Sequence, residues 1–313
     1  MKKFFTNALC LVATLLGFTG CGSSTQSSNW LSEYEVKVAI DETFAPVMSE
    51  EASTYGLINV EATMLPYYVS EDSAMHLLVN DSLFLAIVTR PLNEKEENYI
   101  KGTGRSALQA KIATDAFALV VRAGSADTLF TLDDLRGIVT GKITRWEQLS
   151  HSHSTSELKL VFDNSGSSTV RFMRDSLCEG KPLAGNVFAQ GSSEAVIEAV
   201  KNKKGIIGVV GVDWLRAKGD STLKDFNSLD VTVARVSRYA DERSNYCRPW
   251  QLYIARNDYP LTRSVYAICT DPRSKSLLKN FYFFLKGDRG QRIICNSQMV
   301  PNTPVYVYQV KLK

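Results

Sequence analysis

A run of hydroxyl side chains marks the segment of this sequence best suited to binding an anion. Residues 163–171 read Asp-Asn-Ser-Gly-Ser-Ser-Thr-Val-Arg, and an apolar run that ends at Phe162 precedes them. The first amides of a helix lack partners within the helix, and the helix dipole favours negative charge there. The pattern predicts either an anion cradle or a Ser/Thr N-cap that only begins a helix. The candidates are Ser165, Gly166, Ser167, Ser168, Thr169 and Arg171.

Three shorter polar segments also stand where an apolar run ends or a helical stretch begins. In open α/β sheets, ligands bind outside the carboxyl ends of the strands. The guanidinium of Arg90 is either a forked donor to an oxyanion or part of an ordinary surface residue. The candidates in these segments are Thr43, Phe44, Ser70, Thr89 and Arg90.

Catalysis and metal binding find little support in the residue types. No Gly-x-Ser-x-Gly elbow surrounds Ser165 or Ser167, so a serine hydrolase is a minor alternative. The three histidines are dispersed or lie in a polar loop. We therefore expect no catalytic residue, no metal ion and no cofactor.

The cysteines show no Cys-x-x-Cys spacing, which argues against a zinc or redox site. An oxidising envelope would permit disulfides, and three complete pairings stay open. The four cysteines concerned are Cys178, Cys247, Cys269 and Cys295.

Short apolar runs that alternate with helical stretches should position these side chains. Such alternation predicts α/β layers with mainly parallel sheets. A polar stretch at 220–243 is expected on the surface near a domain edge. Strands are predicted at 36–40, 57–64, 83–88, 116–121, 158–162, 206–210 and 252–254, and helices at 73–79, from 131, at 170–177, 195–200, 274–285 and from 291.

The first twenty residues read as a secretory signal, with Lys2 and Lys3 before an apolar run. Thr19 and Gly20 directly before Cys21 resemble the lipobox of bacterial lipoproteins, in which the cysteine is acylated. The Ser-rich residues after Cys21 are typical of a flexible tether. Acyl chains on the cysteine would anchor the body to a membrane. A plain secretory signal with a chance cysteine is the alternative.

Composition excludes several classes of protein. The 313 residues are 44% hydrophobic and 22% charged, unlike a disordered chain or a multi-span membrane protein. Without residues 1–20, 34 basic and 33 acidic residues remain, a formal charge of +1. A nucleic-acid binder would carry a stronger basic footprint. The length suits two domains.

Several segments occur in the order typical of one family. Residues 131–146 contain Gly-Lys-Ile-Thr-Arg-Trp after a helix start, and residues 165–169 resemble a Ser-Gly-Thr loop. Residues 205–209 resemble a Gly-x-Ile-Gly-Tyr strand, with Val209 where Tyr is usual. Residues 43–44, 259–263 and 290–291 add weaker matches. Together these segments, spread over residues 36–301, resemble the substrate-binding protein of bacterial phosphate ABC transporters, a type 2 periplasmic binding protein.

The resemblance implies a two-lobed α/β fold with two crossover segments and a ligand cleft between the lobes. The expected parts are a signal peptide at 1–20, a tether at 21–30, lobe 1 at 31–121 and 247–313, and lobe 2 at 122–246. The implied protein is a monomer in the periplasm or cell envelope, anchored at Cys21. It is not an enzyme, and it delivers phosphate or a similar oxyanion to an ABC permease in the inner membrane.

Two departures from the family pattern affect the expected pocket. Thr89 stands where the family has an aspartate that accepts a hydrogen bond from phosphate, and Val161 stands where it has an arginine. Arg90 and Arg171 are candidates to supply the positive charge. The alternative function is a non-transport envelope lipoprotein, used in sensing or assembly, that keeps this fold with an altered pocket.

Replacement of the lipobox cysteine tests the anchor. Cys21→Ser should leave the precursor without acyl chains, because the thiol is the acylated group in the lipoprotein family. Metabolic labelling with palmitate should mark the wild type alone, and equal label in both proteins would contradict the anchor.

Overall fold

One compact unit, residues 32–313, holds every residue that the structure, a computed structural model, describes. These are residues 34–216, 226 and 230–305. The predicted signal peptide at 1–20, the tether at 21–30 and Cys21 lie outside them. None of the helices in the described part is long and apolar enough to cross a bilayer.

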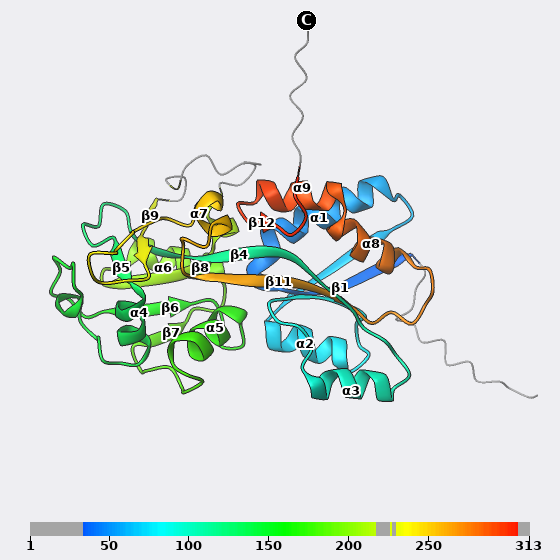
Figure 1. Cartoon of the computed structure of the whole chain (residues 1–313), viewed down its shortest axis with the longest axis horizontal. Helices are drawn as coiled ribbons and strands as arrows, with labels where there is room; N and C mark the ends of the chain where they lie inside the picture. The colour runs from blue at the N-terminus through cyan, green and yellow to red at the C-terminus, as the bar shows by residue number, and fades with distance from the viewer. Residues whose placement is uncertain (1–33, 217–225, 227–229, 306–313) are drawn as a thin grey trace, which may run out of the picture. The chain divides into compact units, whose positions relative to one another are not determined.

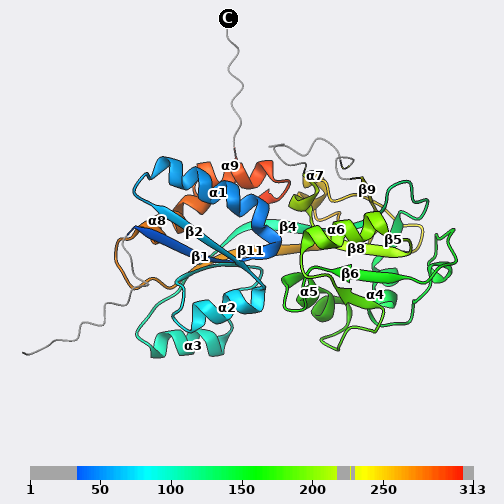
Figure 2. The same cartoon turned by 180° about the vertical axis from the view of Figure 1, so that it is seen from behind.

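Ten strands of the described chain form one curled sheet, which Figures 1 and 2 show from opposite sides. Six of the strands, β1, β2, β3, β6, β7 and β8, pair in parallel with a neighbour. The strands that pair with β4 are antiparallel to it, so the expectation of mainly parallel sheets is wrong for the middle of the molecule. The order is β2 (Thr63–Val69), β1 (Glu35–Asp41), β3 (Leu85–Val88), β11 (Thr262–Cys269), β4 (Leu108–Arg122), β8 (Ile206–Gly211), β6 (Lys159–Phe162) and β7 (Val187–Ala189). Strands β9 (Val231–Val233) and β12 (Val300–Pro301) also pair with β4, and β5 (Leu129–Thr131) pairs separately with β10 (Arg235–Ser237).

Strand β4 is shared by the two lobes. It pairs with β11 up to Ala116 and with β8 from Phe117 onward. The chain therefore changes lobe in the middle of a long strand rather than in a loop. The predicted lobe limits, 31–121 with 247–313 for lobe 1 and 122–246 for lobe 2, stay a prediction. On β4, the pairing partner changes from β11 to β8 between Ala116 and Phe117.

Helices cover both faces of the sheet in each lobe (Figures 1 and 2). Lobe 1 carries α1 (Ala45–Ile58), α8 (Leu277–Lys286) and α9 (Asp288–Asn296) on one face, and α2 (Glu71–Val79) and α3 (Glu94–Gly102) on the other. Lobe 2 carries α6 (Ser193–Asn202) and α7 (Gln251–Ala255) on one face, and α4 (Leu132–Val139) and α5 (Ser168–Leu177) on the other. Helix α7 lies within 247–313, the range predicted for lobe 1, but its Ile254 packs in the hydrophobic cluster of lobe 2. Short 3₁₀ turns η1 (Glu42–Phe44), η2 (Trp146–Gln148) and η3 (Val212–Leu215) complete the described elements.

Each lobe buries its own hydrophobic cluster. In lobe 2, Phe130 from β5, Leu135 from α4 and Phe162 from β6 belong to one such cluster. In lobe 1, Leu78 from α2 and Val88 from β3 belong to another. The strands and helices that lead to the predicted site are thus held from within each lobe.

Most predicted elements are confirmed, but the strands at 57–64 and 252–254 are wrong. Residues 57–64 include the end of α1 and the start of β2, and 252–254 lie in the five-residue helix α7. The apolar periodicity of the sequence does not reveal helix α1, because the charged Glu51 interrupts the buried face of the helix. The apolar run of α7 is too short for its period to be read.

The stretch at 220–243 is only partly a surface segment. Its residues 220–225 and 227–229 lie outside the described part. Residues 231–233 form β9 and residues 235–237 form β10, and Val231, Val233 and Val236 are buried. Pairing of β9 with β4 and of β10 with β5 explains the burial.

Substitution of Gly208 tests the packing of β8 against β4 and α6. A Cβ at Gly208 would lie 2.8 Å from side-chain carbons of Val120, Val196 and Val200. Gly208→Ala should therefore lower the free energy of unfolding by about 1–3 kcal/mol in urea titrations. Gly185→Ala is the control, since nothing lies within 4 Å of its added Cβ; equal stability of the two variants would contradict the packing.

Candidate functional site

A buried arginine from β11 lies at the centre of the candidate site. The Arg263 side chain is 3% exposed and donates from Nε to Asp115 Oδ2 at 2.9 Å. Its Nη2 donates to Thr43 Oγ1 at 3.0 Å, and its Nη1 donates to Ser168 Oγ. Since Thr43 follows β1 and Ser168 begins α5, this one guanidinium contacts both lobes.

Two aromatic rings enclose the same guanidinium. Arg263 Cζ lies 4.7 Å from the centroid of the Phe44 ring and 4.1 Å from that of Phe117. Cation–π attraction gains strength when water is excluded, as it is here. The charge of Arg263 is therefore held in a fixed, dry position.

Two further carboxyl groups lie beside this arginine. Asp41 Oδ1 accepts from Thr43 N at 3.1 Å and from Thr43 Oγ1 at 2.9 Å, while Asp41 Oδ2 has no hydrogen-bond partner. Burial raises the pKa of Asp41 although Arg263 opposes the shift. Burial also raises the pKa of Asp163 to about 7, and the charge of Asp41 adds to the rise. Asp41 Oδ2 and Asp163 Oδ1 are buried without a close hydrogen-bond partner. The hydroxyls of Ser168 and Ser167 nevertheless act to lower the pKa of Asp41 and of Asp163, respectively, against the effect of burial.

A second arginine joins the lobes beside the first cluster. Arg171 of α5 donates from Nε to Glu71 Oε2 at 2.6 Å and from Nη2 to Thr89 Oγ1 at 2.6 Å. The backbone N–H of Thr89 donates to Glu71 Oε1 at 2.7 Å, and its hydroxyl does so at 2.6 Å. Burial alone would raise the pKa of Glu71, but Arg171 and Thr89 together hold it below its ordinary value.

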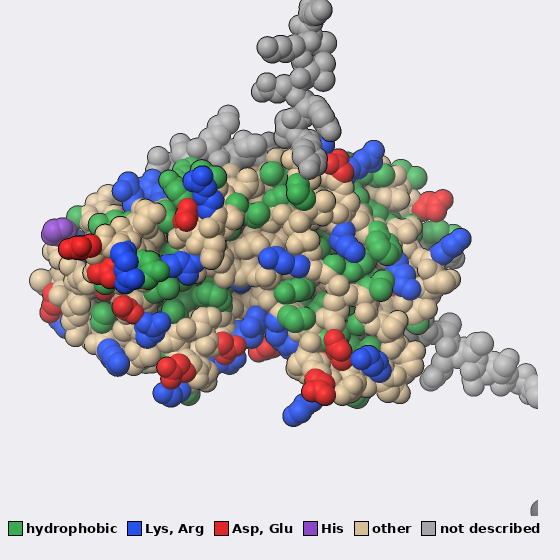
Figure 3. Space-filling view, viewed as in Figure 1, with side chains coloured by type: hydrophobic (Ala, Val, Ile, Leu, Met, Phe, Trp, Pro, Cys, Tyr) green, Lys and Arg blue, Asp and Glu red, His purple; other side chains and the backbone are tan. Residues whose placement is uncertain are grey.

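The two lobes touch closely at Ser70 and Gly166. Ser70 caps α2 by accepting from Ser73 N at 3.2 Å. A Cβ at Gly166 would lie 3.2 Å from Ser70 Oγ, and Asp72 N donates to the Gly166 carbonyl at 3.3 Å. The position therefore favours glycine. Figure 3 shows the surface hollowed between the lobes, with basic and acidic side chains at the head of the notch.

The structure brings most of the predicted site residues together. Thr43, Phe44 and Ser168 meet at Arg263, and Thr89 meets Arg171. Ser167 is the N-cap of α5 and accepts from Val170 N at 3.3 Å, and an anion cradle at the same helix start stays a prediction. Thr169 Oγ1 lies 3.5 Å from Asp163 Oδ2.

Arg90 and Ser165 lie apart from these contacts. Both Nη atoms of Arg90 donate to Glu96 at 2.8 Å, and Nη1 also donates to the carbonyl of Pro91. The side chain of Ser165 is exposed. The ligand-binding roles of all these residues stay predictions.

Sequence reasoning missed the residues that set the charge of the site. Buried and partly buried residues alternate at the start of β11, and Arg263 occupies a buried position. Because a lone charged residue is rare at a buried position of a strand, this pattern could have identified Arg263 from the sequence. Asp163 could have been included as a candidate, since it lies two residues before the run of hydroxyl side chains that begins at Ser165. No local pattern identified the other missed residues, Asp41, Glu71, Asp115 and Phe117.

Other chemistry-bearing groups lie outside the site. No cluster of three or more His, Cys, Asp or Glu able to hold a metal occurs in the described part of the chain. Cys178, Cys247, Cys269 and Cys295 are free thiols, so none of the possible disulfides is formed.

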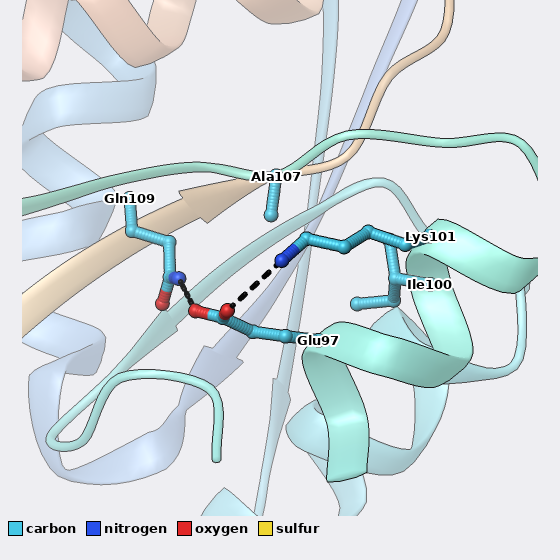
Figure 4. A pocket seen from close by; sticks show the side chains of 5 residues that line it. All are labelled: Glu97, Ile100, Lys101, Ala107 and Gln109. Atoms are coloured by element: carbon cyan, nitrogen blue, oxygen red, sulfur yellow. Dashed lines mark hydrogen bonds and ion pairs between the residues drawn. The ribbon is translucent and has the colours of Figure 1, made fainter. Parts of the chain in front are cut away.

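A small cavity of about 200 Å³ lies between α3 and β4 and includes none of the predicted site residues (Figure 4). Glu97 accepts there from Gln109 at 2.9 Å and from Lys101 at 3.5 Å. Its polar groups thus partner one another. The cavity offers no comparable donor set for an anion.

The raised pKa of Asp163 predicts a pH dependence of stability. Asp163 contributes fully to the free energy of unfolding below the pKa of about 4 that it has in the unfolded chain. This contribution is lost as the pH rises through the pKa of about 7 that Asp163 has in the folded protein. Asp163→Asn should therefore gain stability relative to wild type between pH 4 and pH 8, by roughly 2–4 kcal/mol. Urea unfolding across this range measures the difference. The exposed Asp258→Asn variant is the control, and parallel profiles for Asp163→Asn and wild type would refute the assignment.

Comparison with known proteins agrees with this fold. The model of the PBP superfamily domain matches residues 22–289. The phosphate-binding protein PstS of Staphylococcus aureus is 22% identical over 297 residues, which cover 93% of this chain and 86% of that protein. Its counterpart from Staphylococcus saprophyticus is 19% identical, with 93% and 88% covered.

Solved structures show the same architecture. A phosphate ABC transporter substrate-binding protein from Clostridium perfringens, solved with bound phosphate, has a TM-score of 0.69 at 18% identity and covers 86% of this chain and 100% of its own. An ABC-type phosphate transport receptor from Vibrio cholerae has a TM-score of 0.63 at 19% identity, with 85% and 99% covered. The predicted two-lobed α/β fold is confirmed, and the chain belongs to the PBP superfamily.

Proposed function

We propose that this protein binds an inorganic oxyanion, phosphate, between its lobes. The observation that carries the proposal is the contact of one buried guanidinium, Arg263, with Thr43 of lobe 1 and Ser168 of lobe 2. Both hydroxyls were predicted from the sequence to bind an anion. The relatives named as phosphate-binding proteins support phosphate as the ligand.

Short neutral donors and two arginines would hold the anion. Arg171 and Arg263 stand in for the arginine that Val161 replaces, since both link the lobes. Each hydrogen bond to a charged group contributes roughly 1.5–3 kcal/mol. A hinge movement of the lobes about the shared strand β4 would admit the anion and then exclude water. The mechanism requires no covalent step, so we propose a binding protein rather than an enzyme.

Delivery to a membrane partner completes the proposal. We infer an envelope protein anchored by acyl chains on Cys21, acting as a monomer with an ABC permease of the inner membrane. The relative described as an ABC-type phosphate transport receptor supports the partner. The Ser-rich tether after Cys21 supports the anchor.

The surplus of carboxyl groups in the site favours a second candidate function. Asp41, Glu71, Asp115 and Asp163 surround two arginines, and negative charge opposes an entering anion. A non-transport lipoprotein that keeps the fold for sensing or assembly would tolerate this charge.

Calorimetry with phosphate separates the two functions. Wild type should bind phosphate with a sub-millimolar Kd, and Arg171→Ala should bind it at least about tenfold more weakly, a loss of about 1.4 kcal/mol. Arg174→Ala is the matched control, because Arg174 lies on the same helix and pairs with the exposed Asp175. Absence of binding heat in wild type would favour the non-transport function, and equal affinity of the two variants would reject the role of Arg171.

A further inference from the structure

The Glu71 carboxylate has the hydrogen-bond partners of a bound oxyanion. It accepts from a backbone N–H, a hydroxyl and a guanidinium, which belong to Thr89 and Arg171. Its side chain is 1% exposed. Two of the groups proposed to hold phosphate are thus already engaged by an acid of the chain itself.

This carboxylate also connects the two lobes. Glu71 and Thr89 belong to lobe 1, and Arg171 belongs to α5 of lobe 2. Beside it, Asp72 N donates to the Gly166 carbonyl, and Asn164 donates to Glu42 across the same boundary. Hydrogen bonds between ionised groups, such as those of Glu71 with Arg171, are stronger than those between neutral groups.

An arriving anion cannot share these donors with Glu71 at low cost. The Arg171 Nε bonds to one oxygen of Glu71, Arg171 Nη2 lies 3.4 Å from the other, and like charges repel strongly where water is excluded. The lowered pKa keeps Glu71 ionised at neutral pH, so protonation does not relieve the conflict there. Either Glu71 moves away or the anion binds weakly.

We propose that Glu71 is an internal competing anion that clasps the lobes through Arg171 and Thr89 and sets the affinity of the site for phosphate. The inference rests on the proposed function for its ligand, but the clasp itself does not. Displacement of Glu71 by the ligand would then be part of binding.

Phosphate calorimetry on Glu71→Gln tests the competition. The amide keeps the shape of the side chain but not its charge, so affinity for phosphate should rise about tenfold over wild type. Glu42→Gln is the matched control, since Glu42 contacts the other lobe at Asn164 and not at Arg171. A gain specific to Glu71→Gln supports competition, whereas equal gains in both variants, or none, would overturn it.

Small-angle X-ray scattering without phosphate tests the clasp independently. The radius of gyration of Glu71→Gln should exceed that of wild type and of Glu42→Gln, because the lobes lose their ionic contact. If Glu71→Gln folds poorly, Glu71→Ala replaces it. Glu71→Ala should also raise both the affinity for phosphate and the radius of gyration. If no variant binds phosphate, the proposed function fails, and the scattering alone decides: an unchanged radius overturns the clasp, and an increased one supports it.

Discussion

The buried charge of Arg263 is the constraint on which the candidate site depends. A guanidinium removed from water is costly unless it is paired and fully hydrogen-bonded. Asp115 supplies the opposing negative charge, Thr43 and Ser168 accept two further hydrogen bonds, and the ring centroids of Phe44 and Phe117 lie 4.7 Å and 4.1 Å from the guanidinium carbon. These partners come from both lobes, so satisfying one arginine requires the lobes to meet in a defined way.

The remaining groups adjust the charge around that arginine. Burial raises the pKa of Asp163 to about 7, which lessens its negative charge near neutral pH. Burial raises the pKa of Asp41 as well, against the opposing charge of Arg263. Glu71 stays ionised because Arg171 and Thr89 surround it. The site is therefore a balance of opposing charges rather than a simple positive pocket, and small changes in protonation or in the position of Glu71 would change its preference for an anion.

The sequence predicted the architecture well because strand ends, N-caps and hydroxyl runs are local features. The run of hydroxyl residues, for example, does contain the N-cap of a helix, Ser167 of α5. The charged residues were harder to predict because their contacts are distant in the sequence. Arg263 lies on β11, and it contacts Thr43 and Ser168, which are far from it along the chain. Helix α1 was missed for a related reason: a buried Glu51 breaks the apolar period on which helix prediction relies.

A crystal structure of the protein grown with phosphate would test the central claim most directly. The account predicts a phosphate between the lobes, within hydrogen-bond distance of Arg263, Thr43 and Ser168, with Glu71 withdrawn from Arg171. Phosphate density elsewhere on the protein, with the contacts of Arg263 and Glu71 unchanged, would contradict it.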